Sequence, residues 1–87
     1  MKVFKYTLRQ DEAEQTITLS KFATILSVQN QNENLVLYAT SDNNIPEKRT
    51  IGVVATGQDI NALYGNPTYI GAVLFKGGTF VLHVFEL

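Results

Sequence analysis

The sequence contains no cysteine. This absence excludes a disulfide framework and a thiolate metal site, so stability has to come from packing or from self-association. Histidine is almost as scarce, with one residue in 87, whereas imidazole-based zinc sites need several His or Cys ligands. We therefore expect no bound metal and no cofactor, and the composition is compatible with a reducing compartment.

Long apolar runs and an excess of charge are also missing. No stretch comes near the roughly 18 apolar residues that cross a bilayer, and Lys5 and Arg9 interrupt the apolar run that a secretory signal would need. The formal net charge of -1 denies the chain the basic surface with which proteins neutralise many phosphates. These absences predict a cytosolic protein that binds neither a membrane nor nucleic acid.

The sequence is rich in alternating apolar and polar residues, which is the period of a half-buried β-strand. Phe4, Tyr6 and Leu8 fall on one side of an extended segment whose other side carries Lys5. Apolar residues make up 45% of the chain and charged residues 17%, as in globular proteins. With 87 residues, the chain has room for one domain, spanning 1–87.

This alternation predicts seven short strands, at residues 4–8, 16–19, 22–29, 35–40, 49–56, 68–75 and 79–85. We expect the first two strands to form a hairpin, the next two a central hairpin through a turn at 30–34, and the last two a hairpin through a two-residue Gly77-Gly78 turn. Two polar loops are expected, at 41–48 and 57–67. Residues 59–64 of the longer loop can form a single helical turn.

The fold class is therefore mainly β, a single-domain antiparallel β-sandwich or partly open barrel of about seven strands with at most one short helix. If the final strand lies at the edge of a sheet, no tail after Leu87 covers it. Edge pairing, or an apolar face, would then produce a homo-oligomer.

His83 lies between Leu82 and Val84 in the last predicted strand. As the only histidine, it is the candidate for a general base or for a hydrogen bond to a ligand. The alternative is a strand histidine that is paired with a neighbouring carbonyl or hydroxyl group. The chain has no nucleophile elbow, no phosphate-loop lysine motif and no pair of histidines, so we expect no enzyme and assign no catalytic residue.

The turn Thr56-Gly57-Gln58 follows the fifth predicted strand. Its backbone amides and the Gln58 amide can form a concave array of donors that suits an anion or a carbonyl-rich ligand. The alternative is that Gly57 permits a tight turn that Thr56 caps. Arg49 begins the same strand, but at roughly 3.3 Å per residue an extended strand places it more than about 20 Å from Gly57. Arg49 and Gly57 can meet only across a subunit contact or in a sharply bent sheet.

Three tyrosines, Tyr38, Tyr64 and Tyr69, join an apolar ring to a hydroxyl group. Such side chains stack on a ligand base or pack at the rim of a core. The apolar strand around Tyr38 favours core packing, whereas both interpretations stay open for Tyr64 in the long loop.

Several segments carry a resemblance, in the order Lys2-Val3-Phe4-Lys5-Tyr6, Ile25-Leu26-Ser27-Val28-Gln29, Leu37-Tyr38-Ala39, Thr56-Gly57-Gln58, Tyr69-Ile70-Gly71 and His83-Val84-Phe85-Glu86. Nearly end to end, the chain resembles a family of small phage and prophage proteins of unknown function. In that family the turn looks like Gly-Thr-Gly-His and the strand before it carries a tryptophan, where this chain has Ala55, Gln58 and Tyr38. If the histidine of the family's turn were a catalytic base, this chain would lack it, which argues for binding rather than turnover.

The resemblance transfers no established activity. A phage setting, a small size and the absence of catalytic machinery lead us to expect a counter-defence protein in the host cytosol that sequesters a nucleotide-derived signalling molecule without turnover. Its expected ligand-binding residues are Thr56, Gly57, Gln58, Tyr64, Tyr69 and His83. The alternative is a protein–protein interaction module, an inhibitor of a host factor or a minor structural component, that uses a strand edge or an apolar patch.

Overall fold

The structure is a computed structural model that describes residues 1–59 and 66–87. It contains seven strands, which are β1 (Lys2–Leu8), β2 (Glu14–Ser20), β3 (Ile25–Gln31), β4 (Asn34–Ser41), β5 (Pro46–Ala55), β6 (Thr68–Phe75) and β7 (Phe80–Glu86). A short 3-10 turn, η1 (Lys76–Gly78), is the one helical element among the described residues. Within that same part of the chain, no helix has the length and apolar character that crossing a bilayer requires.

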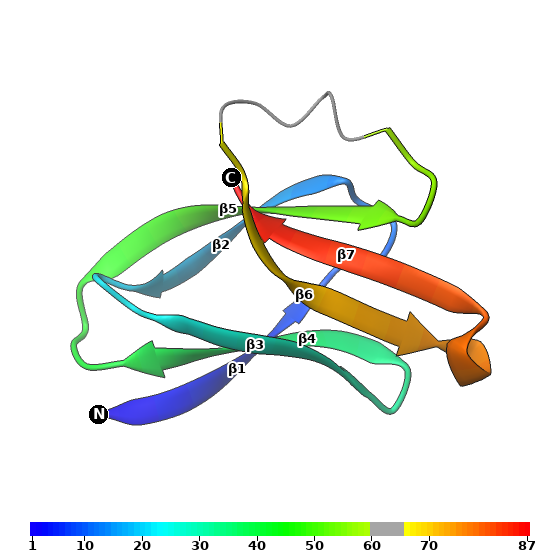
Figure 1. Cartoon of the computed structure of the whole chain (residues 1–87). Helices are drawn as coiled ribbons and strands as arrows, with labels where there is room; N and C mark the ends of the chain where they lie inside the picture. Colours follow the sequence, from blue (N-terminus) through cyan, green and yellow to red (C-terminus); the bar gives the residue numbers. More distant parts are fainter. Residues whose placement is uncertain (60–65) are drawn as a thin grey trace.

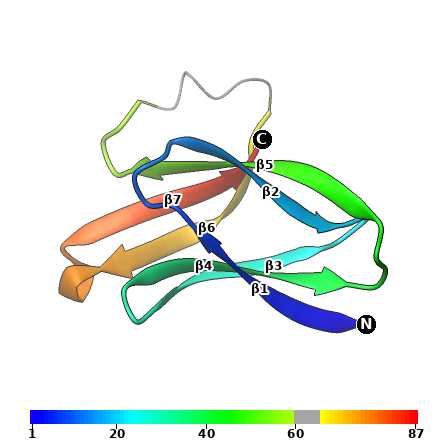
Figure 2. The same cartoon turned by 180° about the vertical axis from the view of Figure 1, so that it is seen from behind.

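The strands form two antiparallel sheets that lie over one another as two layers (Figures 1 and 2). One sheet has three strands in the order β1-β4-β3, and the other has four in the order β2-β5-β7-β6. The predicted fold class, a small mainly β sandwich of about seven strands, is therefore confirmed.

The core lies between the two layers. Strand β4 is the middle strand of its sheet, and its alternate residues Leu35, Leu37 and Ala39 have no exposed surface. From the other sheet, Ile51 and Val84 face them and are equally buried. This inward set follows the period of two that the sequence shows.

The two layers are joined along one side, where β3 lies against β6. The Asn30 side-chain amide donates a hydrogen bond to the backbone oxygen of Leu74 at 2.9 Å. A Cβ atom at Gly71 would come within 3.3 Å of Val28, so the absence of a side chain there permits the close approach. Strands β1 and β2 bound the opposite side, where neither has a second neighbouring strand among the described residues.

The predicted first hairpin is wrong. Strand β1 pairs with β4, and β2 pairs with β5 in the other sheet, so the chain changes layers between them. The buried side chain of Gln15 makes this corner possible, because its amide accepts from the Arg9 nitrogen and donates to the Arg9 oxygen, both at 2.8 Å. A side chain thus satisfies backbone groups that a hairpin ladder would otherwise pair.

The last strand does not lie at an edge, because β7 lies between β5 and β6, so the condition for edge pairing through this strand is not met. The third hairpin, β6 to β7, is confirmed, but its turn is longer than two residues. Lys76, Gly77 and Gly78 all have positive φ, and Phe75 pairs with Phe80. The second hairpin, β3 to β4, is confirmed as well, with a tighter turn at Asn32 and Glu33.

Some boundaries differ from the prediction. Strand β3 begins at Ile25 rather than residue 22, because Phe22 adopts a positive φ of 63° in a turn. Strand β5 begins at Pro46 rather than Arg49, since proline is tolerated as the first residue of a strand. The predicted helical turn at 59–64 falls almost entirely outside the described residues.

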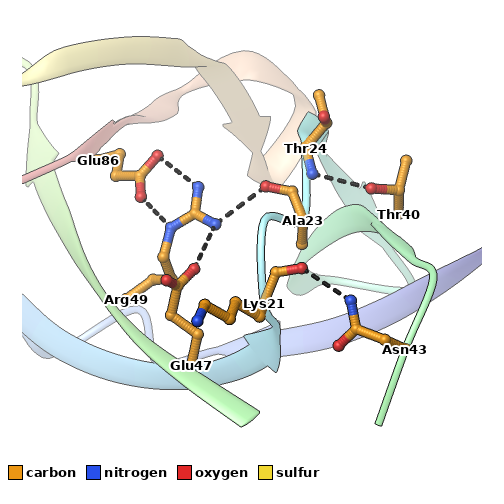
Figure 3. A network of polar contacts seen from close by, with 8 residues as sticks. All are labelled: Lys21, Ala23, Thr24, Thr40, Asn43, Glu47, Arg49 and Glu86. Carbon is orange, nitrogen blue, oxygen red and sulfur yellow. Dashed lines mark hydrogen bonds and ion pairs between the residues drawn. The ribbon is translucent and has the colours of Figure 1, made fainter. Parts of the chain in front are cut away.

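Arg49 connects three separate segments on the inward side of the four-stranded sheet (Figure 3). Its guanidinium group donates two hydrogen bonds to the Glu86 carboxylate in β7 and one, of 2.9 Å, to the backbone oxygen of Ala23. The Glu47 carboxylate lies 3.5 Å away. The side chain of Arg49 is only 19% exposed, so these partners replace the water that its charge has lost.

The hydrogen bond to Glu86 is the main reason that the pKa of Arg49 is raised, against the opposing effect of partial burial. The guanidinium group therefore stays charged. Its planar fork is fully used within the fold, which leaves Arg49 with a structural role rather than the ligand-binding role that the sequence left open.

We expect Arg49→Met to lower the free energy of unfolding by about 1–3 kcal/mol, because it leaves the half-buried Glu86 carboxylate and the Ala23 oxygen without their donor. Urea denaturation measures the change. The matched control is Arg9→Met, which removes an exposed ion pair with Asp11 and should hardly alter the midpoint. Equal losses in the two variants would contradict this role for Arg49.

Candidate functional site

Three of the predicted site residues meet on the outer face of the four-stranded sheet. The hydroxyl of Thr56 lies 2.8 Å from Nε2 of His83, and the hydroxyl of Tyr69 lies 3.1 Å from Nδ1 of the same ring. Thr56 directly follows β5, Tyr69 lies in β6 and His83 lies in β7. We call this group the imidazole cluster.

Strand register brings the imidazole cluster together. In β7, Leu82 and Val84 point into the core, so His83 points outward. Its neighbours across the sheet are Val54 of β5 and Ala72 of β6. A register shift between Tyr69 and Gly71 pairs Tyr69 with Phe85, one outward position away from His83.

Both nitrogens of His83 have hydroxyl partners. A neutral imidazole has one N–H donor and one acceptor nitrogen, and a hydroxyl group can serve either of them. Thr56 and Tyr69 therefore satisfy the ring in either tautomer. This geometry matches the interpretation of His83 as a strand histidine paired with neighbouring hydroxyl groups, and it also fixes the orientation of the ring.

Tyr69 adds an aromatic surface to the cluster. Its ring is packed edge-on against Phe85, with centroids 5.1 Å apart, and lies 6.1 Å from the His83 ring. Tyr69 is nevertheless 52% exposed. The sheet thus presents the ring of Tyr69 to solvent. Phe85 contacts this ring, and His83 is hydrogen-bonded to its hydroxyl group.

Gln58 is separated from the imidazole cluster. Its Oε1 accepts a hydrogen bond from the backbone nitrogen of Ala55 at 2.7 Å, and its own backbone nitrogen donates to the Ala55 oxygen at 3.0 Å. The side chain borders a cavity of about 250 Å³ at one end of the core. The residues around this end cavity are Gln10, Asp11, Ala13, Val53, Ala55, Gln58, Phe80 and Leu82.

A carboxylate stands at the rim of the end cavity. The hydrogen bond from Arg9 lowers the pKa of the Asp11 carboxyl, so the group is ionised at neutral pH. The guanidinium group of Arg9 lies 3.4 Å from this carboxylate, so the entrance carries an ion pair and no net charge. Inside, the end cavity is bordered by the apolar side chains of Val53, Phe80 and Leu82.

The other predicted residues have varied positions. Gly57 has a φ of +89° with open space around it, so a glycine is required there by the backbone conformation. Tyr64 lies outside the described residues. Tyr38 is half-buried in β4 and so belongs to the other sheet. Among residues 1–59 and 66–87, no three His, Asp or Glu side chains gather to hold a metal ion.

Sequence reasoning missed a groove on the side bounded by β1 and β2. A cavity of about 230 Å³ there is bordered by Phe4 and Tyr6 of β1, by Ser20 of β2 and by Ile45 of the loop between β4 and β5. A second cavity, of about 290 Å³, adjoins Phe4 and continues toward Met1. The alternation in residues 2–8 marks Phe4 and Tyr6 as inward-facing, but the assumed hairpin placed β2 beside them as a partner.

The groove contains an unusual polar atom. The hydroxyl oxygen of Ser20 is buried and has no hydrogen-bond partner in the part of the chain that the structure describes. Phe4 and Ile45, which also border the groove, are exposed. The lining is mixed, because Thr18, Ser41, Asn43 and Asn44 border the groove as well.

Together, the fold and these sites define a small two-layered antiparallel β-sandwich with a hydroxyl–imidazole–hydroxyl cluster on one outer face and a groove of mixed polarity on its open side. The chain belongs to the family of domains of unknown function DUF7352, which matches residues 1–87. No curated protein matches it. No solved structure matches it either. The family is one of unknown function, as the resemblance implied, and a phage origin stays a prediction.

We expect Thr56→Val to release one nitrogen of His83 from its partner. In the original chain, the ¹⁵N spectrum of His83 should show two hydrogen-bonded ring nitrogens, whereas the variant should lose the signature at Nε2. The free energy of unfolding should fall by less than about 1 kcal/mol, because the site is open to solvent. Thr68→Val, on an exposed residue of the same sheet, is the control. Identical spectra for the original chain and Thr56→Val would refute the contact.

Proposed function

We propose that this protein is a binding protein without turnover, and that its ligand is a small molecule with a planar heterocyclic ring that stacks on Tyr69. The observation that carries the proposal is the fixed, half-exposed ring of Tyr69, held by Phe85 and His83. An aromatic ring held in place on the face of a sheet is a common platform for nucleobases, since every base has a π-face.

Preorganisation supports binding at this platform. A free surface tyrosine loses rotamer freedom when a ligand stacks on it, whereas Tyr69 is already held by a hydrogen bond of 3.1 Å and an edge-on contact. The hydroxyl groups of Thr56 and Tyr69 each keep hydrogen-bonding capacity beyond their bond to His83. They can therefore pair with polar groups at the edge of a stacked ring.

The charges favour a single nucleotide-derived molecule over a polymer. The chain has a net charge of -1, and the guanidinium fork of Arg49 is occupied by Glu86. A nucleic-acid strand would need a row of cations along its backbone. A small molecule that is recognised through its heterocycle and its hydroxyl groups needs no such row.

A counter-defence role follows from this ligand class if the chain is phage-encoded. Sequestration removes a nucleotide-derived signal without chemistry, so it needs only affinity and abundance. Gln58, where the resembled family has a histidine, uses its side-chain oxygen in the turn and leaves no imidazole there. This favours binding over turnover.

Isothermal titration calorimetry with cyclic dinucleotides and ADP-ribose-type molecules tests the proposal. We expect at least one of these to bind, and Tyr69→Ala to weaken it by about tenfold or more, because stacking on one base contributes about 1–3 kcal/mol. Leu74→Ala is the matched control, since Leu74 is equally exposed on the same strand and some 16 Å away at about 3.3 Å per residue.

Two outcomes would count against this function. One is a panel that gives no heat with the original chain at tens of micromolar protein. The other is a ligand whose affinity Tyr69→Ala and Leu74→Ala reduce equally, because the platform would then have no special part in binding.

The second predicted function, a protein-interaction module, is favoured by a separate observation. Strand β1 is an edge strand beside the groove, and a partner strand added to such an edge gains backbone hydrogen bonds while the groove takes a side chain. A host protein that used this edge would compete there with any other strand, including one from another copy of the chain.

A further inference from the structure

Strand β1 presents an edge that lacks the usual protection. It pairs with β4 on one side, and no other strand of the described chain lies on its second side. Val3 and Phe4 in this strand are 57% and 45% exposed. Natural proteins commonly protect an apolar edge with a charged side chain, a proline or a bulge, because unpaired backbone groups recruit other strands.

The lysine that could protect this edge is directed elsewhere. Lys5 lies in the middle of β1, and its ammonium group donates a hydrogen bond of 2.8 Å to the side-chain oxygen of Gln31 in β3. Because β3 lies on the far side of β4, the Lys5 side chain extends over its own sheet and away from the free edge. Apart from Lys2 at the start of the strand, the edge is left with the exposed apolar residues Val3 and Phe4 and with its unpaired backbone.

We propose that a second copy of this chain occupies the edge, with the two β1 strands antiparallel and Phe4 of each copy opposite Phe4 of the other. The three-stranded sheets would then join into one continuous six-stranded sheet. This inference concerns a different surface from the Tyr69 platform, so it stands whether or not that platform binds a ligand.

Charge favours this register over the one centred on Lys5. Side chains keep to their own face of a sheet, so two copies related by a twofold axis can pair only with one residue opposite its own copy. Centring the pair on Lys5 would place two lysines directly opposite each other, which is unfavourable unless both ammonium groups keep their hydrogen bonds to Gln31. Centring it on Phe4 places Val3 opposite Lys5 and Lys2 opposite Tyr6, so no like charges face each other.

Exposure selects the same register. The pairing centred on Phe4 uses residues 2–6, which all lie within β1 and include its exposed half. Centring on Val3 would need Met1, which lies outside the strand, and centring on Tyr6 would extend to the buried Leu8. The Phe4 register therefore joins the most exposed part of the edge without leaving the strand.

The groove gives the inward side of this interface a place to pack. Phe4 borders both cavities on the open side, close to Tyr6 and Ile45. In the dimer, Phe4 of the second copy would pack beside the exposed Phe4 of the first, and Lys2 would lie over the ring of Tyr6, a favourable cation–π arrangement. An aromatic pair across two strands adds to the stability of a sheet. The edge is thus compatible with a second copy of itself in polarity and charge.

Cross-linking tests the register directly, because the chain has no cysteine of its own. Val3→Cys and Lys5→Cys are purified separately, mixed, allowed to exchange and oxidised. We expect a disulfide-linked dimer in the mixture and little in either variant alone, since Val3 of one copy lies opposite Lys5 of the other. Efficient cross-linking of either variant alone would overturn this register.

Sedimentation tests the dimer itself. The original chain at tens of micromolar should show a species of twice the 9.7 kDa chain mass. Phe4→Glu, which places two carboxylates directly opposite each other, should shift it to the monomer. Leu26→Glu, at a similarly exposed apolar residue of β3 in the same sheet, should leave the dimer intact. Circular dichroism confirms that both variants fold. A monomeric original chain, or equal dissociation of both variants, would overturn the proposal.

Discussion

The ion pair between Arg49 and Glu86 is the contact on which the arrangement of the four-stranded sheet depends. It joins β5 to β7 and, through the Ala23 oxygen, holds the segment that carries the chain from one sheet into the other (Figure 3). A charge that is mostly withdrawn from water has few acceptable positions, because each lost hydrogen bond has to be replaced. The pair therefore selects one register of β7 against β5.

The same register determines which side chains of β7 face outward. Since Glu86 faces inward with Val84 and Leu82, His83 and Phe85 have to face outward. A slip by one residue would bury the imidazole and expose the valine, so the register of the ion pair also fixes the imidazole cluster.

Much of the fold could be predicted from residue patterns, because a period of two and clusters of turn residues are local signals. The β3–β4 and β6–β7 hairpins follow from such signals at Asn32 and at Gly77. The pairing of β1 with β4 could not be predicted in this way. The turn after Leu8 is short and polar enough for a hairpin, and only the buried amide of Gln15, bound to Arg9 at 2.8 Å, shows that the chain turns a corner there. The position of β7 in the middle of its sheet was missed for a related reason, since the order of strands in a sheet is set by contacts between distant segments.

The candidate site divides in the same way. Thr56, Tyr69 and His83 could be selected by residue type, and the structure brings these three together. Their meeting depends on β7 lying between β5 and β6, which no local pattern indicates. Gln58 was grouped with Thr56 because the two residues are two positions apart in the sequence. In the structure, however, Gln58 borders the end cavity. The groove beside Phe4 was missed because its walls come from strands that had been assigned to each other as partners.

The non-local pairing of the strands bears on how the chain folds as well as on its final shape. Among the strands that the structure describes, β1 pairs with β4 alone and β2 with β5 alone, so each must wait for a partner that lies several elements later in the chain. Loops of this length have to close before their contacts stabilise anything, which slows folding in proteins dominated by distant pairings. During synthesis, β1 emerges first and spends the longest time without a neighbour. Both of its edges are then open, and the hairpin of β3 and β4 has to reach one of them before another chain does.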